Sequence, residues 1–415
     1  MSLPLTPGQG QIDRPGEGPR EARRPTPRGP ATVLHLIDTG GPGGAETIYA
    51  ELVGGLDRNR WRSITAVPER DWLHAELEAR GIEPVLLTSR GSFDVGYLAA
   101  LFNLVRRHRV DLIHAHLLTT SVYGSLVGRL TGVPVICTFH GQPDLPPDER
   151  FRAAKLRIID RRSNRITFVS EALRRWFLER TSLTPARTAV VHNGIDPARF
   201  APTRDRSFRD EIGARPDQIL VGAIGNLRRS KDYPTLLRAA AVLHGATAAY
   251  RFVIVGHTEE RLYAELLALR ASLGLDDVVA FTGFREDVER ILNALDLFII
   301  TSNAEGFSLA TVQAMACGVP VVATRCGGPE EIIDDGVTGI LTEPGEPELL
   351  ASAIQRLGHD ADLRLRLTAA ARGIAANRFS IDAMIRGYEA LYEERMRKHP
   401  PHAGARALPA ESGRA

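Results

Sequence analysis

The hydrophobic residues of this chain gather in short runs that alternate with longer helix-forming stretches. Such runs recur at 32–37, 63–67, 85–87, 112–115, 135–139, 165–169 and 188–192. Stretches such as 45–56 and 96–107 separate them and are expected to be helices. Buried apolar strands that alternate with helices predict a parallel sheet covered by helices on both faces.

A second series of the same kind begins at residue 220. Its strands are expected at 220–224, 252–255, 278–282, 297–301, 319–323 and 339–341. The charged, proline-containing stretch before it is typical of a linker. We therefore predict an α/β fold with two Rossmann-like, doubly wound domains at 31–197 and 219–380, joined by a linker at 198–218. Such sheets bind ligands beyond the carboxyl ends of their strands, so a cleft between the domains is the expected site.

Composition narrows the class of protein. A length of 415 residues suits two domains, and 52 Lys+Arg against 50 Asp+Glu leave a net charge of +2, which argues against a nucleic-acid partner. The three cysteines include no CxxC pair, which fits a reducing cytosol. No apolar run is long enough to span a bilayer. We expect a cytoplasmic protein with disordered tails at 1–30 and 399–415.

The segment 302–331 carries the most specific chemistry in the chain. Glu305 precedes a Gly-Phe-Ser turn that opens a small-residue helix at about 309–316. A helix N-terminus behind such a turn offers unpaired N–H groups to a phosphate, and the carboxylate ahead of it can hold sugar hydroxyls. The segment therefore indicates a nucleotide-sugar site. Its donor-binding candidates besides Glu305 are Gly306, Phe307, Ser308, Leu309, Gln313 and Glu331.

This segment resembles the signature of retaining glycosyltransferases of family 4, which have the GT-B fold. The family pattern is Glu, Gly-Phe-Gly or similar, and a second Glu eight positions after the first, where this chain has Gln313. In the family the first acid lies by the donor sugar and the second holds the ribose hydroxyls. Gln313 would bind that diol without charge assistance.

The resemblance extends over roughly 31–395 and implies an activity. It implies a metal-independent hexosyltransferase without a cofactor, which moves a sugar from a nucleotide-diphosphate donor, first of all a UDP-sugar, to a hydroxyl acceptor with retention. Polysaccharide, lipid-linked glycan or glycolipid synthesis would be its setting. It also implies that a last helix at 381–397 packs back onto the first domain.

A basic turn follows the first strand of the second sheet. The family keeps an arginine there and a lysine five residues later, and both hold the diphosphate. Lys231 fits the lysine, whereas Asn226 stands in the place of the arginine. Arg228 or Arg229 could supply that charge, which would stabilise the departing diphosphate.

A later loop carries two further candidates. Phe284 and Arg285 follow another strand, at the place where the family meets the nucleotide base. Simple loop packing is the alternative for these two residues.

A glycine-rich loop at 38–46 follows the first strand of the chain. Gly43, Gly44 and Glu46 resemble the acceptor-side loop of the family. A dinucleotide fingerprint counted from Gly41 needs glycine at its sixth place, where Glu46 stands, and this argues against a dehydrogenase. Asn193 is expected at the hinge and cleft floor.

Three histidines end strands of the first sheet. Alternation places His114 and His116 on one face, but a zinc site needs further ligands that no spacing supports, so no metal is expected. The family has a histidine near the donor sugar at the place of His116, which we expect to be catalytic together with Glu305 and Lys231. His140 is expected either to line the cleft or to pack in its loop.

A basic stretch and two alternative functions complete the predictions. Arg150–Arg165 interleaves apolar side chains with seven basic residues, and is either a solvated helix face or a contact with the anionic inner face of the cytoplasmic membrane. The Asp-Ala-Asp at 360–362 fits a helix start and not a metal motif.

The chain could also be a GT-B epimerase or phosphorylase. It could equally be an inactive nucleotide-binding subunit, because Asn226 and Gln313 weaken two expected contacts.

Overall fold

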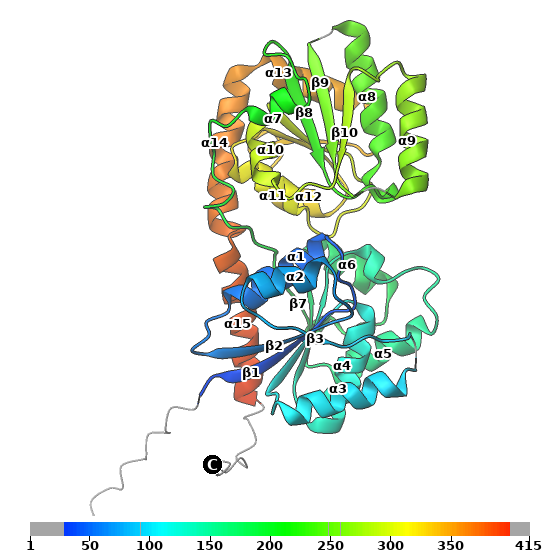
Figure 1. Ribbon diagram of the computed structural model, residues 1–415, viewed down its shortest axis with the longest axis vertical. Coiled ribbons are helices and arrows are strands. Elements are labelled where there is room, and N and C mark those ends of the chain that lie inside the picture. The colour runs from blue at the N-terminus through cyan, green and yellow to red at the C-terminus, as the bar shows by residue number, and fades with distance from the viewer. Residues whose placement is uncertain (1–28, 92, 248, 258, 399–415) are drawn as a thin grey trace, which may run out of the picture.

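Two parallel sheets stacked end to end form the molecule, as the computed structural model shows (Figure 1). The structure describes residues 29–91, 93–247, 249–257 and 259–398. The predicted tails lie outside the described residues, apart from 29 and 30. No helix within the described ranges is both long enough and apolar enough to cross a bilayer.

The first sheet has seven strands in the order β3-β2-β1-β4-β5-β6-β7. Its strands are β1 (Ala31–Leu36), β2 (Trp61–Val67), β3 (Val85–Leu86), β4 (Leu112–His116), β5 (Val135–Phe139), β6 (Arg165–Phe168) and β7 (Thr188–Val190). Its helices are α1 (Gly44–Gly55), α2 (Trp72–Ala79), α3 (Val95–Arg107), α4 (Leu118–Thr131), α5 (Arg152–Arg162) and α6 (Glu171–Arg180). Strands β4 and β5 are buried along their whole length, because helices cover both faces of the sheet.

The second sheet has six strands in the order β10-β9-β8-β11-β12-β13. They are β8 (Ile219–Ile224), β9 (Tyr250–Val255), β10 (Val279–Gly283), β11 (Leu297–Ile300), β12 (Val321–Thr324) and β13 (Ile340–Thr342). The helices are α7 (Ser207–Glu211), α8 (Tyr233–Ala246), α9 (Glu260–Ser272), α10 (Val288–Ala294), α11 (Leu309–Ala316), α12 (Gly328–Ile332), α13 (Pro347–His359) and α14 (Ala361–Arg378). The predicted α/β fold with two doubly wound parallel sheets is confirmed.

The strand order reverses once in each sheet, between β1 and β4 and between β8 and β11. At such a point the loops leave the sheet in opposite directions and open a crevice beyond the carboxyl ends of the strands. In Figure 1 these ends of the two sheets face one another across the middle of the molecule. The fold therefore brings the loops after β1, β4, β5, β8 and β11 to one place.

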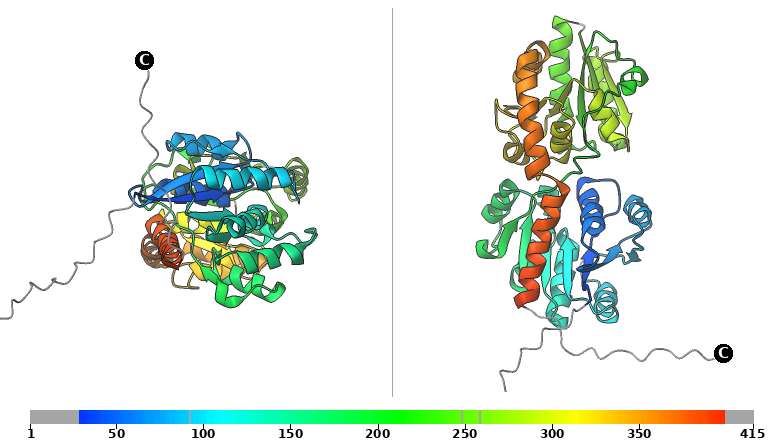
Figure 2. Two further views of the ribbon diagram at one scale, coloured as in Figure 1. Left: turned by 90° about the horizontal axis from the view of Figure 1, so that it is seen from below. Right: turned by 90° about the vertical axis from the view of Figure 1, so that its left-hand side faces the viewer.

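The last helix, α15 (Ile381–Lys398), returns from the second domain to the first. In the right-hand panel of Figure 2 it runs down the face of the lower domain that is turned to the viewer, and it packs against α1. Tyr388 and Tyr392 of this helix are completely buried against the sheet. The expected return of this helix is thus present in the structure.

The two crossings between the domains lie side by side. Ile195 donates from its backbone N–H to Phe379 O at 2.9 Å and accepts from Ile381 N at 2.8 Å. A Cβ added at Gly194 would lie 2.4 Å from the backbone oxygen of Ser380. The close approach of the two crossing segments therefore requires glycine there. This paired crossing is where the domains are joined.

Candidate active site

A cavity of about 810 Å³ lies between the two domains. Its first-domain side consists mainly of the loops that follow β1, β4 and β5, and its second-domain side of the loops that follow β8, β10 and β11. Both sets of loops come from the carboxyl ends of parallel strands. The cavity therefore occupies the place where a doubly wound fold binds its ligands.

Lys231 and Glu305 form an ion pair inside this cavity. The distance from Lys231 Nζ to Glu305 Oε1 is 2.6 Å, and Ser302 Oγ donates to the same oxygen at 2.6 Å. The two residues are 74 positions apart in sequence, and their side chains are mostly buried but line the cavity. An anionic ligand that enters here would meet an ammonium group and a carboxylate next to one another.

The turn after Glu305 brings the N-terminus of α11 to the cavity. Ser308 is its first flanking residue, and no side chain among the described residues caps the helix. The N–H groups of the first turn therefore remain available, together with the positive end of the helix dipole. Phe307, Leu309 and Gln313 line the cavity beside them.

Gly306 makes direct contact between the domains possible. A Cβ at this position would lie 2.2 Å from the carbonyl oxygen of His140 in the first domain. Only glycine allows this approach without a shift of the backbone, so the turn that carries Glu305 is fitted against the opposite domain.

The arginine candidates separate in the structure. Arg228 lines the cavity, whereas Arg229 binds the carboxylate of Glu265 at 3.1 Å on the outside of the domain. Arg285 also lines the cavity, but its guanidinium is bound by Asp287 at 2.8 Å and by Glu211. Arg228 is therefore the arginine from the basic turn that the structure brings to the cavity.

Phe284 and Asn226 lie at the cavity with different contacts. Phe284 is 41% exposed. Asn226 donates from Nδ2 to the carbonyl oxygen of Pro42 at 2.9 Å, and its Oδ1 accepts from the backbone of His257. Asn226 thus bridges the second domain to the glycine-rich loop of the first, where Gly43, Gly44 and Glu46 also line the cavity.

The structure places His140 in the cavity lining and His116 behind it. His116 is completely buried and does not line the cavity, whereas His140 does. Their rings stack, with 2.9 Å between His116 Nδ1 and His140 Nε2. Burial lowers the pKa of both, that of His140 to about 4, so both are neutral at pH 7. His116, expected beside the sugar, supports His140 instead, because its ring is packed against Tyr49 and His114 on one face of the sheet.

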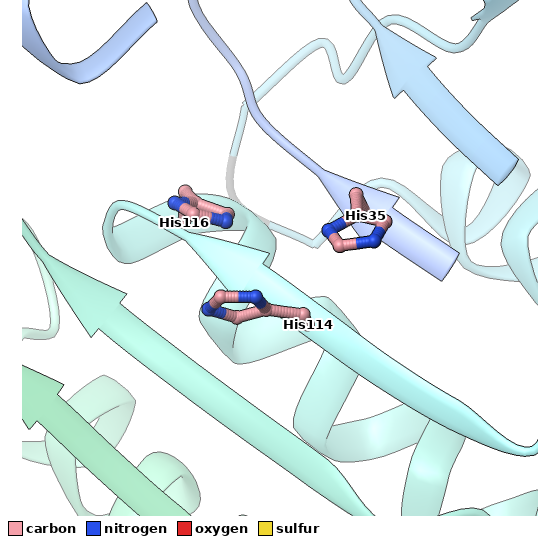
Figure 3. A group of neighbouring side chains, drawn as sticks. All are labelled: His35, His114 and His116. Carbon is pink, nitrogen blue, oxygen red and sulfur yellow. The ribbon is translucent and has the colours of Figure 1, made fainter. Parts of the chain in front are cut away.

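A third buried imidazole, from His35, joins His114 and His116 (Figure 3). His35 pairs in register with His114 across β1 and β4, which puts them on one face of the sheet, and ring nitrogens of the three lie within 4.8 Å of one another. The pairing of β1 with β4 brings His35 to this group. The spacing of histidines along the sequence does not predict that neighbourhood.

The donor set does not suit a metal ion. Both nitrogens of His114 are already bound at 2.7 Å, by Tyr392 Oη and Thr138 Oγ1. None of the three histidines lines the cavity, so a substrate in the cavity does not reach this group. The structure therefore routes no chemistry through this group, and metal independence stays a prediction.

Glu331 lies outside the cavity lining. Its carboxylate accepts from the backbone N–H of Glu171 at 2.9 Å, from that of Ala172, and is 3.1 Å from His192 Nε2. Burial acts to raise its pKa, but these contacts hold the pKa below its usual value. Instead of facing a donor, Glu331 caps α6 of the opposite domain.

Several cavity residues escaped the sequence predictions. Asp38 and Asp144 line the first-domain side, and Asp144 accepts from the backbone N–H of Gly141 at 3.1 Å and from that of His140. Asn193, expected at the cleft floor, lines the cavity and is 4% exposed. Its Oδ1 has no hydrogen-bond partner among the described residues. The position of Asp38 just after the first strand is the sequence signal that could have predicted it as a cavity residue.

Comparisons with known proteins identify the family of the chain. The model of Glycosyltransferase Family 4 matches residues 42–199, and that of glycosyl transferases group 1 matches residues 205–374. The D-inositol 3-phosphate glycosyltransferase of Corynebacterium kroppenstedtii is 31% identical over 328 residues, which cover 74% of this chain and 72% of that protein. The enzyme of the same name from Salinispora arenicola is 30% identical over 339 residues, 75% of each chain.

The solved structures add a close likeness of fold. HepE of Anabaena, in a complex with UDP and glucose, is 26% identical with a TM-score of 0.79, over 88% of this chain and all of that one. A complex of the same protein with UDP-glucose has a TM-score of 0.78. The resemblance seen in the sequence is thus confirmed: the chain belongs to glycosyltransferase family 4 and has the GT-B fold, and it is a glycosyltransferase.

Proposed function

We propose that this glycosyltransferase uses a UDP-sugar donor and transfers the sugar, with retention and without a metal ion, to a hydroxyl group of its acceptor. The observation that carries the proposal is the Lys231–Glu305 pair at 2.6 Å inside a cavity shared by both domains. The complexes of HepE with UDP and with UDP-glucose support the choice of nucleotide.

In this proposal the second domain holds the leaving diphosphate. Lys231, Arg228 and the free N–H groups at the start of α11 would surround its oxygens, since all of them face the cavity. The bond from the anomeric carbon to the diphosphate breaks as the acceptor oxygen attacks from the same side, and the acceptor proton passes to the departing phosphate oxygen. Fixed positive charge at that oxygen stabilises the developing anion.

Glu305 and His140 would orient the transferred sugar. Glu305 exchanges its contact with Lys231 for sugar hydroxyls when the diphosphate arrives. Neutral His140, on the first-domain side, can exchange hydrogen bonds with a hydroxyl group without bringing charge to the cavity. Gln313, also at the cavity, would hold the ribose diol.

Product analysis tests this function directly. The purified chain is incubated with UDP-, GDP- and ADP-sugars and a panel of hydroxyl acceptors, with a chelator present, and the anomeric configuration of the product is read by NMR. The proposal expects UDP release and an axial-to-axial, retained linkage. An inverted product, or activity that vanishes with the chelator, would contradict it. An epimerised or phosphorolysed donor would identify the alternative chemistries.

The inactive-subunit alternative retains one observation in its favour. Asn226, which stands where the family has an arginine, is engaged with the carbonyl oxygen of Pro42. Binding of UDP without hydrolysis or transfer of any donor sugar would support that alternative.

We also propose that the basic face around α5 contacts an anionic bilayer. Phe151 is 52% exposed beneath the guanidinium of Arg150, and it meets Phe93, which is 77% exposed, with ring centroids 5.3 Å apart. An exposed aromatic pair beside arginines suits the boundary between headgroups and acyl chains. Sedimentation with vesicles should increase with their anionic lipid content, and binding independent of that content would exclude the contact.

A further inference from the structure

One contact between the two domains lies outside the cavity. Glu331, on α12 of the second domain, accepts at Oε2 from the backbone N–H of Glu171 at 2.9 Å and at Oε1 from that of Ala172. Its Oε2 is also 3.1 Å from Nε2 of His192. All three partners belong to the first domain and are at least 139 residues away in sequence. We call this set of hydrogen bonds the Glu331 contact.

The partners of Glu331 suit a carboxylate. Glu171 and Ala172 open α6, whose first N–H groups have no partner within the helix and carry the positive end of its dipole. Ser170 Oγ accepts from the N–H of Leu173 at 3.0 Å, so Glu331 completes the capping that Ser170 begins. Hydrogen bonds to an ionised acceptor are about twice as strong as neutral ones. The side chain of Glu331 is still 14% exposed, so water can replace these partners when the domains separate.

The Glu331 contact lies beside the crossings that join the domains. His192 lies just before the first crossing, at Ile195, and its ring meets that of Phe379, at the second crossing, with centroids 5.6 Å apart. Domains of one chain that meet through a small connection commonly rotate about it. Because Glu331 binds the opposite domain next to this connection, it resists such a rotation.

The same contact is connected to the turn that carries Glu305. Gly328, at the start of α12, donates from its backbone N–H to the carbonyl oxygen of Glu305 at 3.1 Å. A Cβ at Gly328 would lie 2.9 Å from Cα of Phe307, so α12 begins directly against this turn. Phe307 also meets the ring of His192, with centroids 6.0 Å apart. The turn and Glu331 therefore contact the same first-domain side chain.

We propose that Glu331 is a positioning residue for the transfer reaction: it holds the domains closed and thereby keeps the turn of Glu305 against the first domain. The inference rests on the proposed function, because an acceptor on the first-domain side reaches the donor only while the domains are closed. Glu331 itself does not line the cavity. The proposed contacts of the diphosphate all lie on the second domain. Loss of the Glu331 contact should therefore slow turnover far more than it weakens UDP binding.

Two variants remove the contact from opposite sides. Glu331→Gln removes the charge of the acceptor. Glu171→Pro removes one donor N–H, and proline suits the first position of a helix, so α6 should still form. Each variant of the full chain should have a larger radius of gyration in small-angle X-ray scattering. Each should release UDP from UDP-glucose, with the hydroxyl acceptors of the product analysis, about tenfold more slowly. The affinity for UDP, from titration calorimetry, should change little.

Matched controls use neighbouring groups. Glu330→Gln changes the adjacent carboxylate of α12, which binds Gly327 of its own domain, and Glu171→Ala keeps the N–H group that Glu331 binds. Both should retain the size and the turnover of the unaltered chain, and melting curves establish that every variant is folded. The double variant Glu331→Gln/Glu171→Pro should be no slower than either single variant, because both changes remove the same contact.

The outcomes separate this inference from the proposed function. A radius of gyration that is unchanged in both Glu331→Gln and Glu171→Pro would overturn the inference. An affinity for UDP that falls as far as turnover would overturn it as well, because Glu331 would then act on donor binding. UDP that fails to bind the unaltered chain would instead overturn the proposed donor, and the scattering comparison would still test the Glu331 contact.

Discussion

The two sides of the cavity are built in different ways. The second-domain side comes largely from two short segments, each of which follows one strand: 226–231 carries the cations Arg228 and Lys231, and 304–313 carries Glu305 and the N-terminus of α11. The first-domain side is assembled from loops far apart in sequence, and its partners come from other elements: His116 supports His140, and Glu51 and Glu76 neutralise Arg80. A site for a fixed chemical group can be encoded locally, whereas a site for a variable acceptor depends on tertiary packing.

Replacement of Lys231 by alanine gives the largest expected effect and tests the cationic side. Turnover should fall by about 10²- to 10³-fold, because the leaving diphosphate loses its ammonium group. The melting temperature should change little. The matched control is Arg229→Ala, which removes a neighbouring cation that binds Glu265 outside the cavity. Equal losses in the two variants, measured as kcat/KM, would contradict the assignment.

A pair of histidine variants separates the group that faces the sugar from the one behind it. His140→Gln should lower kcat by about tenfold to a hundredfold with little loss of stability, since His140 lines the cavity. His116→Gln should instead cost about 1–3 kcal/mol of unfolding free energy, because it buries an amide in the place of a ring that is completely buried against Tyr49 and His114. Urea unfolding and steady-state kinetics on both variants check this. The reverse pattern would indicate that His116, and not His140, contacts the reacting sugar.

The contact between the two sides can be broken at Gly306. A Cβ there would lie 2.2 Å from the carbonyl oxygen of His140, so Gly306→Ala should force the domains apart at a cost of about 1–3 kcal/mol and weaken UDP binding. Gly245→Ala is the control, because nothing lies within 4 Å of its added Cβ and alanine favours the helix. Unchanged UDP affinity in Gly306→Ala would show that the domains do not meet there in solution.

The pH dependence of stability reports the burial of Asp144. Its pKa is raised to about 7 in the folded protein, so the folded state holds a proton that the unfolded state has released. Stability should therefore fall as pH rises from about 4 to about 7. Asp144→Asn should remove this loss and be more stable by about 4 kcal/mol at pH 8, with little difference at pH 4. The unfolding free energies of the two proteins are measured in urea at several pH values. A difference between them that stays the same from pH 4 to pH 8 would contradict the burial of Asp144.

The sequence by itself determined the fold and the chemistry of the second-domain side. Alternating apolar runs specify parallel strands, and a loop that follows a strand must lie at the carboxyl edge of the sheet, so Glu305 and Lys231 were predictable as cavity residues. The glycine at 306 and the uncapped start of α11 follow from the same short segment.

Only the tertiary structure decided which side chains reach the cavity and which are taken by others. Strand alternation predicts the face of the sheet on which His116 lies. It does not predict that the side chain is buried, which depends on the contact with His140 in the loop after β5. Arg229 binds Glu265, 36 residues away in sequence, outside the cavity. Glu331 binds the N-terminus of α6, 160 residues away, and does not line the cavity either. Pairing and burial of charges depend on neighbours brought together by folding, which no local pattern contains.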